Sequence, residues 1–297
     1  MNTPVSGPRS YLFVPGDSAH KMAKAIDSPA DALILDLEDS VAPSRKREAL
    51  TTTVEFLQSR EAQPTGPALW VRVNASDPAL ALAELAALPL AGVAGIVHPK
   101  LECHSQLERM SAWLDALEAR DAISEQPVGI VGIITETPAA IVGETAASLA
   151  RGHARLCGYS WGMEDMSAVL GRPPLQGNTP AHATLSATLQ QHCLLMAAAA
   201  GVEAIDAISS DFRDLDALAG ECEYARELGY TAKMAIHPAQ IETIHSALAP
   251  SVAALEWAKK VQALVDDNPD AAAFSLDGRM VDQPHFKIAQ RILDRTR

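Results

Sequence analysis

Val128-Gly-Ile-Val-Gly-Ile-Ile-Thr135 is an apolar run that ends directly on a carboxylate, Glu136. A second run, Arg155–Trp161, is followed a few residues later by Asp165. Neither run alternates polar and apolar residues, which is typical of strands buried on both faces of a parallel sheet. Parallel sheets and barrels keep their functional sites beyond the carboxyl ends of such strands. Two carboxylates there are suited to one hard divalent cation, so the sequence predicts a Mg²⁺ site.

Further apolar runs extend this pattern along the chain and alternate with Ala- and Leu-rich helical stretches. Eight βα units over about 230 residues match the number and length expected for an α/β fold of the (β/α)8 TIM barrel type. A doubly wound open sheet stays as the alternative, although no Gly-rich phosphate loop follows the first strand. The predicted strands are Tyr11–Pro15, Ala32–Glu38, Leu69–Asn74, Gly95–Pro99, Val128–Thr135, Arg155–Trp161, Glu203–Ser209 and Lys233–His237.

Three segments fall outside this repeat. Residues 1–250 are assigned to the barrel and residues 251–297 to a C-terminal helical extension, with helices predicted over Val252–Val265 and His285–Leu293. A Pro/Gly-rich loop, Gly171–Pro180, follows the sixth strand at the predicted catalytic end. The start of the chain, Met1–Arg9, lacks the apolar core of a signal peptide and is expected to be a disordered lead-in.

Composition narrows the class of protein. The net charge of −13 argues against a nucleic-acid partner, although a local basic cluster can still bind a phosphorylated ligand. The four cysteines form no CxxC spacing, so we expect reduced thiols and a cytoplasmic location. No run approaches the roughly 20 apolar residues of a membrane span, so no membrane partner is expected.

Charged residues also end the second, third and fourth predicted strands. Asp36-Leu-Glu-Asp39 places three acids within four residues, which repel one another unless a cation or a hydrogen-bond donor lies nearby. Arg72 is a charge within a β-branched run and is suited either to a substrate carboxylate or to an ion pair with an acid of the second strand. Lys100 ends the fourth predicted strand at the same rim, and a single lysine there is weak evidence for a functional site.

Each acidic residue also has a purely structural interpretation. Glu38, Asp39, Glu136 and Asp165 could cap the helices that follow them, since acids are favourable before a helix N-terminus. Pro138 supports this interpretation for Glu136, because proline is frequent in the first turn of a helix. Asp282, in the tail, looks like an ordinary loop residue by composition.

The order of these motifs resembles the citrate lyase β-subunit-like and malyl-CoA lyase family of the phosphoenolpyruvate/pyruvate superfamily. The resemblance runs from Arg9 to Leu293, and several motifs in the right order make it specific. The motifs are Arg9–Asp17, Ala32–Pro43, Trp70–Asn74, Pro99-Lys100, the segment around Glu136, Trp161–Asp165 with Leu170-Gly171, Ile236–Gln240 and Leu276–Pro284.

This resemblance implies a Mg²⁺-dependent carbon–carbon lyase, with Mn²⁺ as an alternative metal, that acts on a 3-hydroxyacyl-CoA thioester such as malyl-, citramalyl- or citryl-CoA. It implies Glu136 and Asp165 as metal ligands, which together with Lys100 contact the substrate. It also implies Arg72 as the group that binds the substrate carboxylate or carbonyl. Glu38 and Asp39 would lie around the metal site as catalytic residues.

The resemblance also implies that Asp282 enters a neighbouring subunit's site from a tail that works as a lid, in a homotrimer or a dimer of trimers. The chain departs from the family where Thr137-Pro-Ala-Ala140 replaces a longer segment with an arginine, at His98, and at Met163. These departures affect the expected identity of the substrate more than the expected type of reaction.

Three alternative activities stay open. They are a citrate lyase subunit acting on an acyl-carrier-protein thioester, a malyl-CoA thioesterase and a metal-dependent pyruvate aldolase. For the CoA phosphates the sequence offers several basic candidates, although a solvated helix face explains the Ser44–Arg47 run as well. The candidates are Arg9, Arg45, Lys46, Arg47 and Lys100.

Overall fold

The computed structural model describes residues 7–60, 65–123, 127–172, 179–268 and 271–296. Most of the predicted lead-in and the middle of the Pro/Gly-rich loop after the sixth strand therefore lie outside the described residues. The chain divides into two compact units, Pro8–Ala247 and Leu248–Arg297 with Met1–Gly7. Each unit is described by itself.

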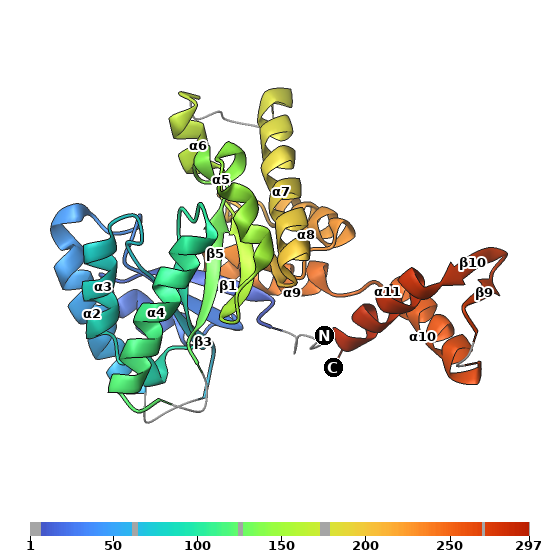
Figure 1. Cartoon of the computed structure of the whole chain (residues 1–297), viewed down its shortest axis with the longest axis horizontal. Helices are drawn as coiled ribbons and strands as arrows, with labels where there is room; N and C mark the ends of the chain where they lie inside the picture. The colour runs from blue at the N-terminus through green and yellow to red at the C-terminus, as the bar shows by residue number, and fades with distance from the viewer. Residues whose placement is uncertain (1–6, 61–64, 124–126, 173–178, 269–270, 297) are drawn as a thin grey trace. The chain divides into compact units, whose positions relative to one another are not determined.

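The larger unit is a closed barrel of eight parallel strands, in which each strand pairs with the next and β8 pairs with β1 (Figure 1). This closure confirms the predicted (β/α)8 barrel and excludes the open sheet. The strands are β1 (Ser10–Pro15), β2 (Ala32–Asp36), β3 (Ala68–Arg72), β4 (Gly95–His98), β5 (Gly129–Ile134), β6 (Leu156–Trp161), β7 (Glu203–Asp206) and β8 (Ala232–Ala235).

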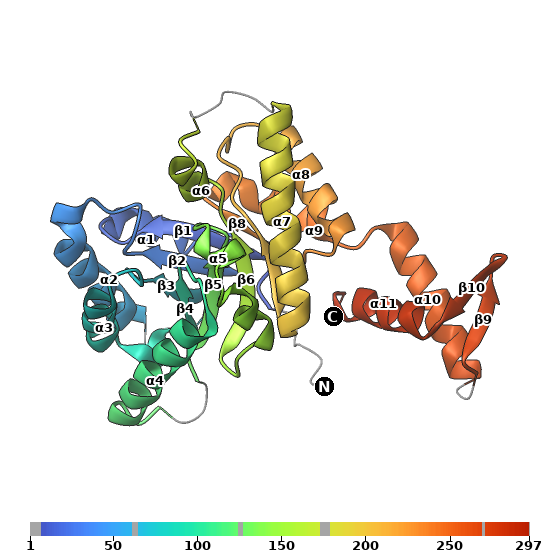
Figure 2. The same cartoon turned by 45° about the horizontal axis from the view of Figure 1, so that its top comes forward.

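Helices surround the barrel and follow its strands in sequence (Figure 2). Side chains of Ser18, Asp77 and Asp214 cap the starts of α1, α3 and α8. The α-helices are α1 (Ala19–Ala25), α2 (Lys46–Arg60), α3 (Pro78–Ala87), α4 (His104–Arg120), α5 (Ala139–Val142), α6 (Glu164–Val169), α7 (Pro180–Ala200), α8 (Leu215–Leu228) and α9 (Ile241–Leu248). Short 3-10 helices cover Pro43–Arg45, Leu90–Gly92, Ala146–Arg151 and Pro238–Gln240.

The barrel interior is filled by alternate side chains of its strands, as their two-residue period requires. Tyr11 and Trp70 meet edge to face, with ring centroids 5.7 Å apart. The Trp70 ring lies over Gly95, where an added Cβ would fall 2.1 Å from Trp70 Cζ3. A glycine at this point of β4 is therefore what admits the indole. The interior side chains include Tyr11, Ala32, Ile34, Trp70, Val97, Val131, Ile133, Ile205, Ala232 and Met234.

The C-terminal unit contains two helices and a β-hairpin, α10 (Val252–Asp267), β9 (Ala273–Leu276), β10 (Arg279–Asp282) and α11 (Gln283–Asp294). The two helices were predicted, whereas the hairpin was not. Its two-residue turn, Asp277-Gly278, has positive φ at both positions, 52° and 76°, which is the geometry that joins twisted antiparallel strands. Val281 and Ala289 are buried against α10 residues Ala258 and Val261.

Two further expectations can be compared with the structure. The four cysteines all lie in described segments and are free thiols. Within the described residues, no helix has both the length and the hydropathy that crossing a bilayer would require.

Candidate active site

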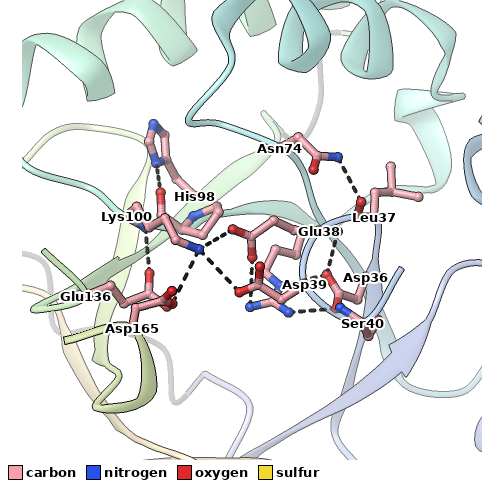
Figure 3. A network of polar contacts seen from close by, with 12 residues as sticks. Asp36, Leu37, Glu38, Asp39, Ser40, Asn74, His98, Lys100, Glu136 and Asp165 are labelled. Carbon is pink, nitrogen blue, oxygen red and sulfur yellow. Dashed lines mark hydrogen bonds and ion pairs between the residues drawn. The ribbon is translucent and has the colours of Figure 1, made fainter. Parts of the chain in front are cut away.

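The carboxyl ends of β2 to β6 bring charged side chains together on one rim of the barrel (Figure 3). Asp36 is the last residue of β2 and Arg72 the last of β3, and the two lie side by side in the strand register. Lys100, Glu136 and Asp165 follow β4, β5 and β6. Residues far apart in sequence therefore face one another, because parallel strands of a barrel end at the same rim.

Arg72 is held by a two-pronged ion pair with Asp36. Its Nε and Nη2 donate to the two Asp36 carboxylate oxygens at 2.7 and 2.6 Å. Asp36 also accepts from the backbone N–H groups of Glu38 and Ser40. Burial alone would raise the pKa of Asp36, but these bonds and the Arg72 charge bring it below its usual range. The ion pair with the second strand, one of the two interpretations of Arg72, is thus present.

Arg72 still has one nitrogen turned toward Glu38. Its Nη1 lies 3.2 Å from Glu38 Oε2, close enough for an ion pair. That oxygen is buried and has no aligned hydrogen-bond donor. Burial raises the pKa of Glu38, against the opposing effect of Arg72 and Lys100. An incompletely satisfied carboxylate oxygen at this rim fits a site that receives a further polar group or a bound water.

Lys100 lies at the centre of the acidic cluster. Its Nζ is 2.5 Å from Glu38 Oε1, 3.3 Å from Asp39 Oδ2 and 3.4 Å from Asp165 Oδ2. Figure 3 shows the ammonium between these acids. Burial would lower the pKa of Lys100, but the hydrogen bond with Glu38 and the surrounding negative charges raise it, so Lys100 is a cation here.

Glu136 is a buried acid that contacts the Lys100 backbone. It is 6% exposed, and its Oε2 accepts a 2.6 Å hydrogen bond from the Lys100 backbone N–H. Burial raises the pKa of Glu136 to about 8, despite the nearby Lys100 and with the negative charges of Glu38 and Asp165 adding to the increase. A buried carboxyl beside other acids becomes an anion readily only when a cation binds it.

These features fit a divalent cation. No cluster of three or more His, Cys, Asp or Glu side chains with metal-site geometry occurs in the described part of the chain. Mg²⁺ needs no such cluster, because it usually takes one or two carboxylates and completes its shell with waters and substrate oxygens. Glu136 and Asp165 are the carboxylates at this rim that could supply such a pair, one beside the Lys100 N–H and the other beside the Lys100 ammonium.

Neither of the two acids makes the side-chain hydrogen bond of a helix cap. Asp165 lies in the first turn of α6, where a carboxylate is favourable. Glu136 does not cap α5, whose N-cap is Pro138 without a side-chain bond, and instead accepts from Lys100. Asp282 belongs to the C-terminal unit, where it precedes α11 and its Oδ1 lies 2.7 Å from His285 Nδ1.

Most basic candidates for the CoA phosphates already have partners. Arg9 pairs with Asp31. Arg45 pairs with Asp17 and Glu48. The Lys46 ammonium donates to the carbonyls of Leu37 and Glu38. With Lys100 in the acidic cluster, Arg47, exposed on α2, is the remaining candidate.

Sequence reasoning missed two residues at this rim, Thr135 and Gly162. Thr135 has a φ of 81°, and its hydroxyl exchanges hydrogen bonds with the Gly162 backbone. Nothing in the sequence signals this contact, because the residues are distant along the chain and a threonine at a strand end is common.

The fold and this rim define a (β/α)8 enzyme with a carboxylate-rich site at the strand ends. A family model described as HpcH/HpaI aldolase/citrate lyase matches residues 9–238. The chain therefore belongs to the HpcH/HpaI aldolase/citrate lyase family and is an enzyme of it. This confirms the family predicted from the motifs, and a carbon–carbon lyase among its named relatives supports the predicted enzyme class.

Several relatives align over nearly the whole chain. The citrate lyase subunit beta-like protein of Mycobacterium tuberculosis is 30% identical over 99% of this chain and 97% of its own length. A (3S)-malyl-CoA thioesterase of Cereibacter sphaeroides is 32% identical over 96% of this chain and 93% of its own. The mitochondrial citramalyl-CoA lyase of Rattus norvegicus is 29% identical, with 96% and 85% covered.

A solved structure shares the fold across both chains. It is CitE from Mycobacterium tuberculosis in complex with magnesium, acetoacetate and coenzyme A. The TM-score is 0.74, with 31% identity and 98% of each chain covered.

Proposed function

We propose that this protein is a Mg²⁺-dependent acyl-CoA lyase that cleaves malyl-, citramalyl- or citryl-CoA reversibly to a keto acid and acetyl- or propionyl-CoA. The observation that carries the proposal is Glu136, a buried carboxyl with a raised pKa next to Asp165 and a central lysine. The magnesium, keto acid and coenzyme A held by the related CitE structure support the same chemistry, as do the thioester substrates in the names of the relatives.

Glu136 and Asp165 would hold the metal, with Mn²⁺ as an alternative. A divalent cation there supplies Lewis-acid polarisation of the oxygens that the substrate presents. Neutralisation by that cation also lets Glu136 stay ionised at neutral pH, which its burial otherwise opposes.

Arg72 and Lys100 are the cations that would orient the substrate. Asp36 fixes the Arg72 guanidinium at two nitrogens, so the third nitrogen keeps a defined direction at the rim. Arg72 then binds the carboxylate or carbonyl of the acid and offsets negative charge as the carbon–carbon bond breaks, a role often worth a few kcal/mol. Glu38 and Asp39 hold the Lys100 ammonium in place.

Protons balance across the cleavage. The 3-hydroxyl passes its proton to water as the bond between C2 and C3 breaks, which gives the keto acid and a thioester enolate. The enolate carbon then takes one proton, from Asp282 or from water.

We propose that this Asp282 comes from a neighbouring subunit, with residues 251–297 acting as a lid over the barrel of residues 1–250 in a homotrimer or dimer of trimers. A cytoplasmic location stays a prediction.

One assay panel tests the proposal. Purified protein with Mg²⁺ is incubated with malyl-, citramalyl- and citryl-CoA, and products are identified by mass spectrometry. A keto acid with acetyl- or propionyl-CoA from one substrate supports the lyase and names its acid. Separate incubations contain pyruvate with an aldehyde, or an acyl-carrier-protein thioester. Turnover of one of these without turnover of any CoA ester would replace the proposed lyase with the aldolase or the citrate lyase subunit.

A thioesterase is the second candidate, favoured by the (3S)-malyl-CoA thioesterase that is 32% identical to this chain. It would use the same rim with water as the attacking group. Free CoA with intact hydroxy acid, and no keto acid at any time in the same panel, would identify it.

A further inference from the structure

Thr135 occupies an unusual position between the two candidate metal ligands. The last register pair of β5 and β6 is Ile134 with Trp161, so Thr135 and Gly162 are the first residues beyond the paired strands. Each begins the loop that carries one acid, Glu136 after β5 and Asp165 after β6. Beyond the pair Ile134 and Trp161, hydrogen bonds between β5 and β6 no longer fix the distance between the two loops.

The Thr135 hydroxyl links the two chain segments where the backbone hydrogen bonds between the strands end. Its Oγ1 donates to the Gly162 carbonyl at 3.1 Å and accepts from the Gly162 N–H at 3.2 Å. A hydroxyl has one donor and two lone pairs, so a single oxygen can make both bonds. Thr135 is fully buried, and water does not compete for them.

The backbone at Thr135 is unfavourable for a β-branched residue. Its φ of 81° lies in the left-handed region, which such side chains rarely adopt. A conformation of this kind persists only where surrounding contacts impose it. It turns the chain sharply between β5 and Glu136, so that Glu136 meets the Lys100 N–H.

Gly162 receives Glu136 directly. A methyl group added at Gly162 would lie 3.1 Å from Glu136 Cγ and 3.3 Å from its Oε1. The Gly162 backbone thus forms the surface against which the Glu136 side chain rests, and the same backbone is held by Thr135.

We infer that Thr135 is a positioning residue: its hydroxyl joins the two loops and sets the placement of Glu136 relative to Asp165 for one divalent cation. This inference rests on the proposed metal site. Thr135 itself need not touch metal or substrate.

The test is Mn²⁺ binding to the purified full chain, measured by electron paramagnetic resonance of the free ion. Thr135→Val keeps the branched shape and removes both hydrogen bonds, so the dissociation constant should rise about ten- to a hundredfold, as for other residues that orient metal ligands. Thr135→Ser keeps the hydroxyl and should bind within a few-fold of wild type. Hydrogen exchange of the Gly162 amide should accelerate in Thr135→Val and not in Thr135→Ser.

The serine and alanine variants give a second matched pair, because they differ only in the hydroxyl, and this pair decides the matter if Thr135→Val does not fold. Equal Mn²⁺ affinity in Thr135→Ser and Thr135→Ala would overturn the inference. So would wild-type affinity in Thr135→Val.

Failure of the metal site itself gives a different result. Glu136→Gln would then bind Mn²⁺ as wild type does, or the wild type would not bind it. Gly162→Ala offers an independent check, since its methyl group should displace Glu136 and weaken Mn²⁺ binding while Thr135 is intact.

Discussion

Neighbouring acids at the rim have different tasks because their partners differ. Asp36 has two guanidinium bonds and two backbone bonds, so it stays ionised and serves Arg72. Glu136 has one backbone bond and a pKa near 8, so it gains most from a bound cation. The difference lies in the hydrogen-bond donors around each carboxylate, since both are buried.

Loss of either proposed ligand should remove metal and turnover together. For Glu136→Gln and Asp165→Asn we expect at least a hundredfold weaker Mg²⁺ binding, since even outer contacts contribute ten- to a hundredfold. Isothermal titration with Mg²⁺ and the product assay measure both effects, and EDTA should abolish wild-type turnover. Glu164→Gln is the matched control, because Glu164 is an exposed neighbour in the first turn of α6. Turnover that persists in EDTA would contradict the metal site.

Burial of His98 should make folding sensitive to pH. Burial lowers the pKa of His98 to about 4. Between roughly pH 6.5 and pH 4, His98 is therefore protonated in the unfolded chain and neutral in the folded chain. As the pH falls through this range, the free energy of unfolding should decrease by up to about 1.4 kcal/mol per pH unit because of His98. Urea unfolding from pH 7 to 4 should show a shallower fall in His98→Leu. His20→Gln, at an exposed site on α1, should keep the wild-type slope.

At the scale of the element, β4 depends on a glycine. An added methyl at Gly95 would fall 2.1 Å from the Trp70 ring, inside a packed barrel. Gly95→Ala should therefore lower the free energy of unfolding by about 1–3 kcal/mol or more. Gly220→Ala is the control: its methyl on α8 meets open space, and alanine favours a helix, so stability should hold or rise by up to about 1 kcal/mol. Equal stability in both variants would show that the barrel repacks freely.

At the scale of the whole molecule, the proposed active site combines residues from two copies of the chain. Asp282→Asn and Glu136→Gln should each be inactive alone. Mixed by unfolding and refolding together, they should regain activity, because some sites then combine an intact Glu136 with an intact Asp282 from the neighbour. Glu136→Gln mixed with Asp165→Asn should regain none, since both changes fall in one barrel.

Light scattering tests the oligomeric state that a shared active site requires. Light scattering should show an assembly larger than one chain. A fully active monomer would contradict the shared site, even if the barrel alone still binds metal.

Sequence patterns favour a barrel and place its acids at the strand ends, and the closed strand pairing excludes the open sheet that these patterns left as an alternative. Eight buried runs at regular spacing encode eight parallel strands, and the residue after each strand must fall at the same edge. The family and the placement of Glu136 and Asp165 at the ends of neighbouring strands were accessible for that reason. The hairpin of the C-terminal unit was not, since its strands are short and half exposed.

Which charged side chains meet depends on the three-dimensional arrangement of the strands. Asp36 binds Arg72 and Lys100 lies among the acids because strands separated by tens of residues end at one rim, and the distances depend on barrel geometry. Thr135 joins Gly162 for the same reason. Local sequence patterns report period and strand ends, whereas the partner of a side chain is set by closure of the barrel.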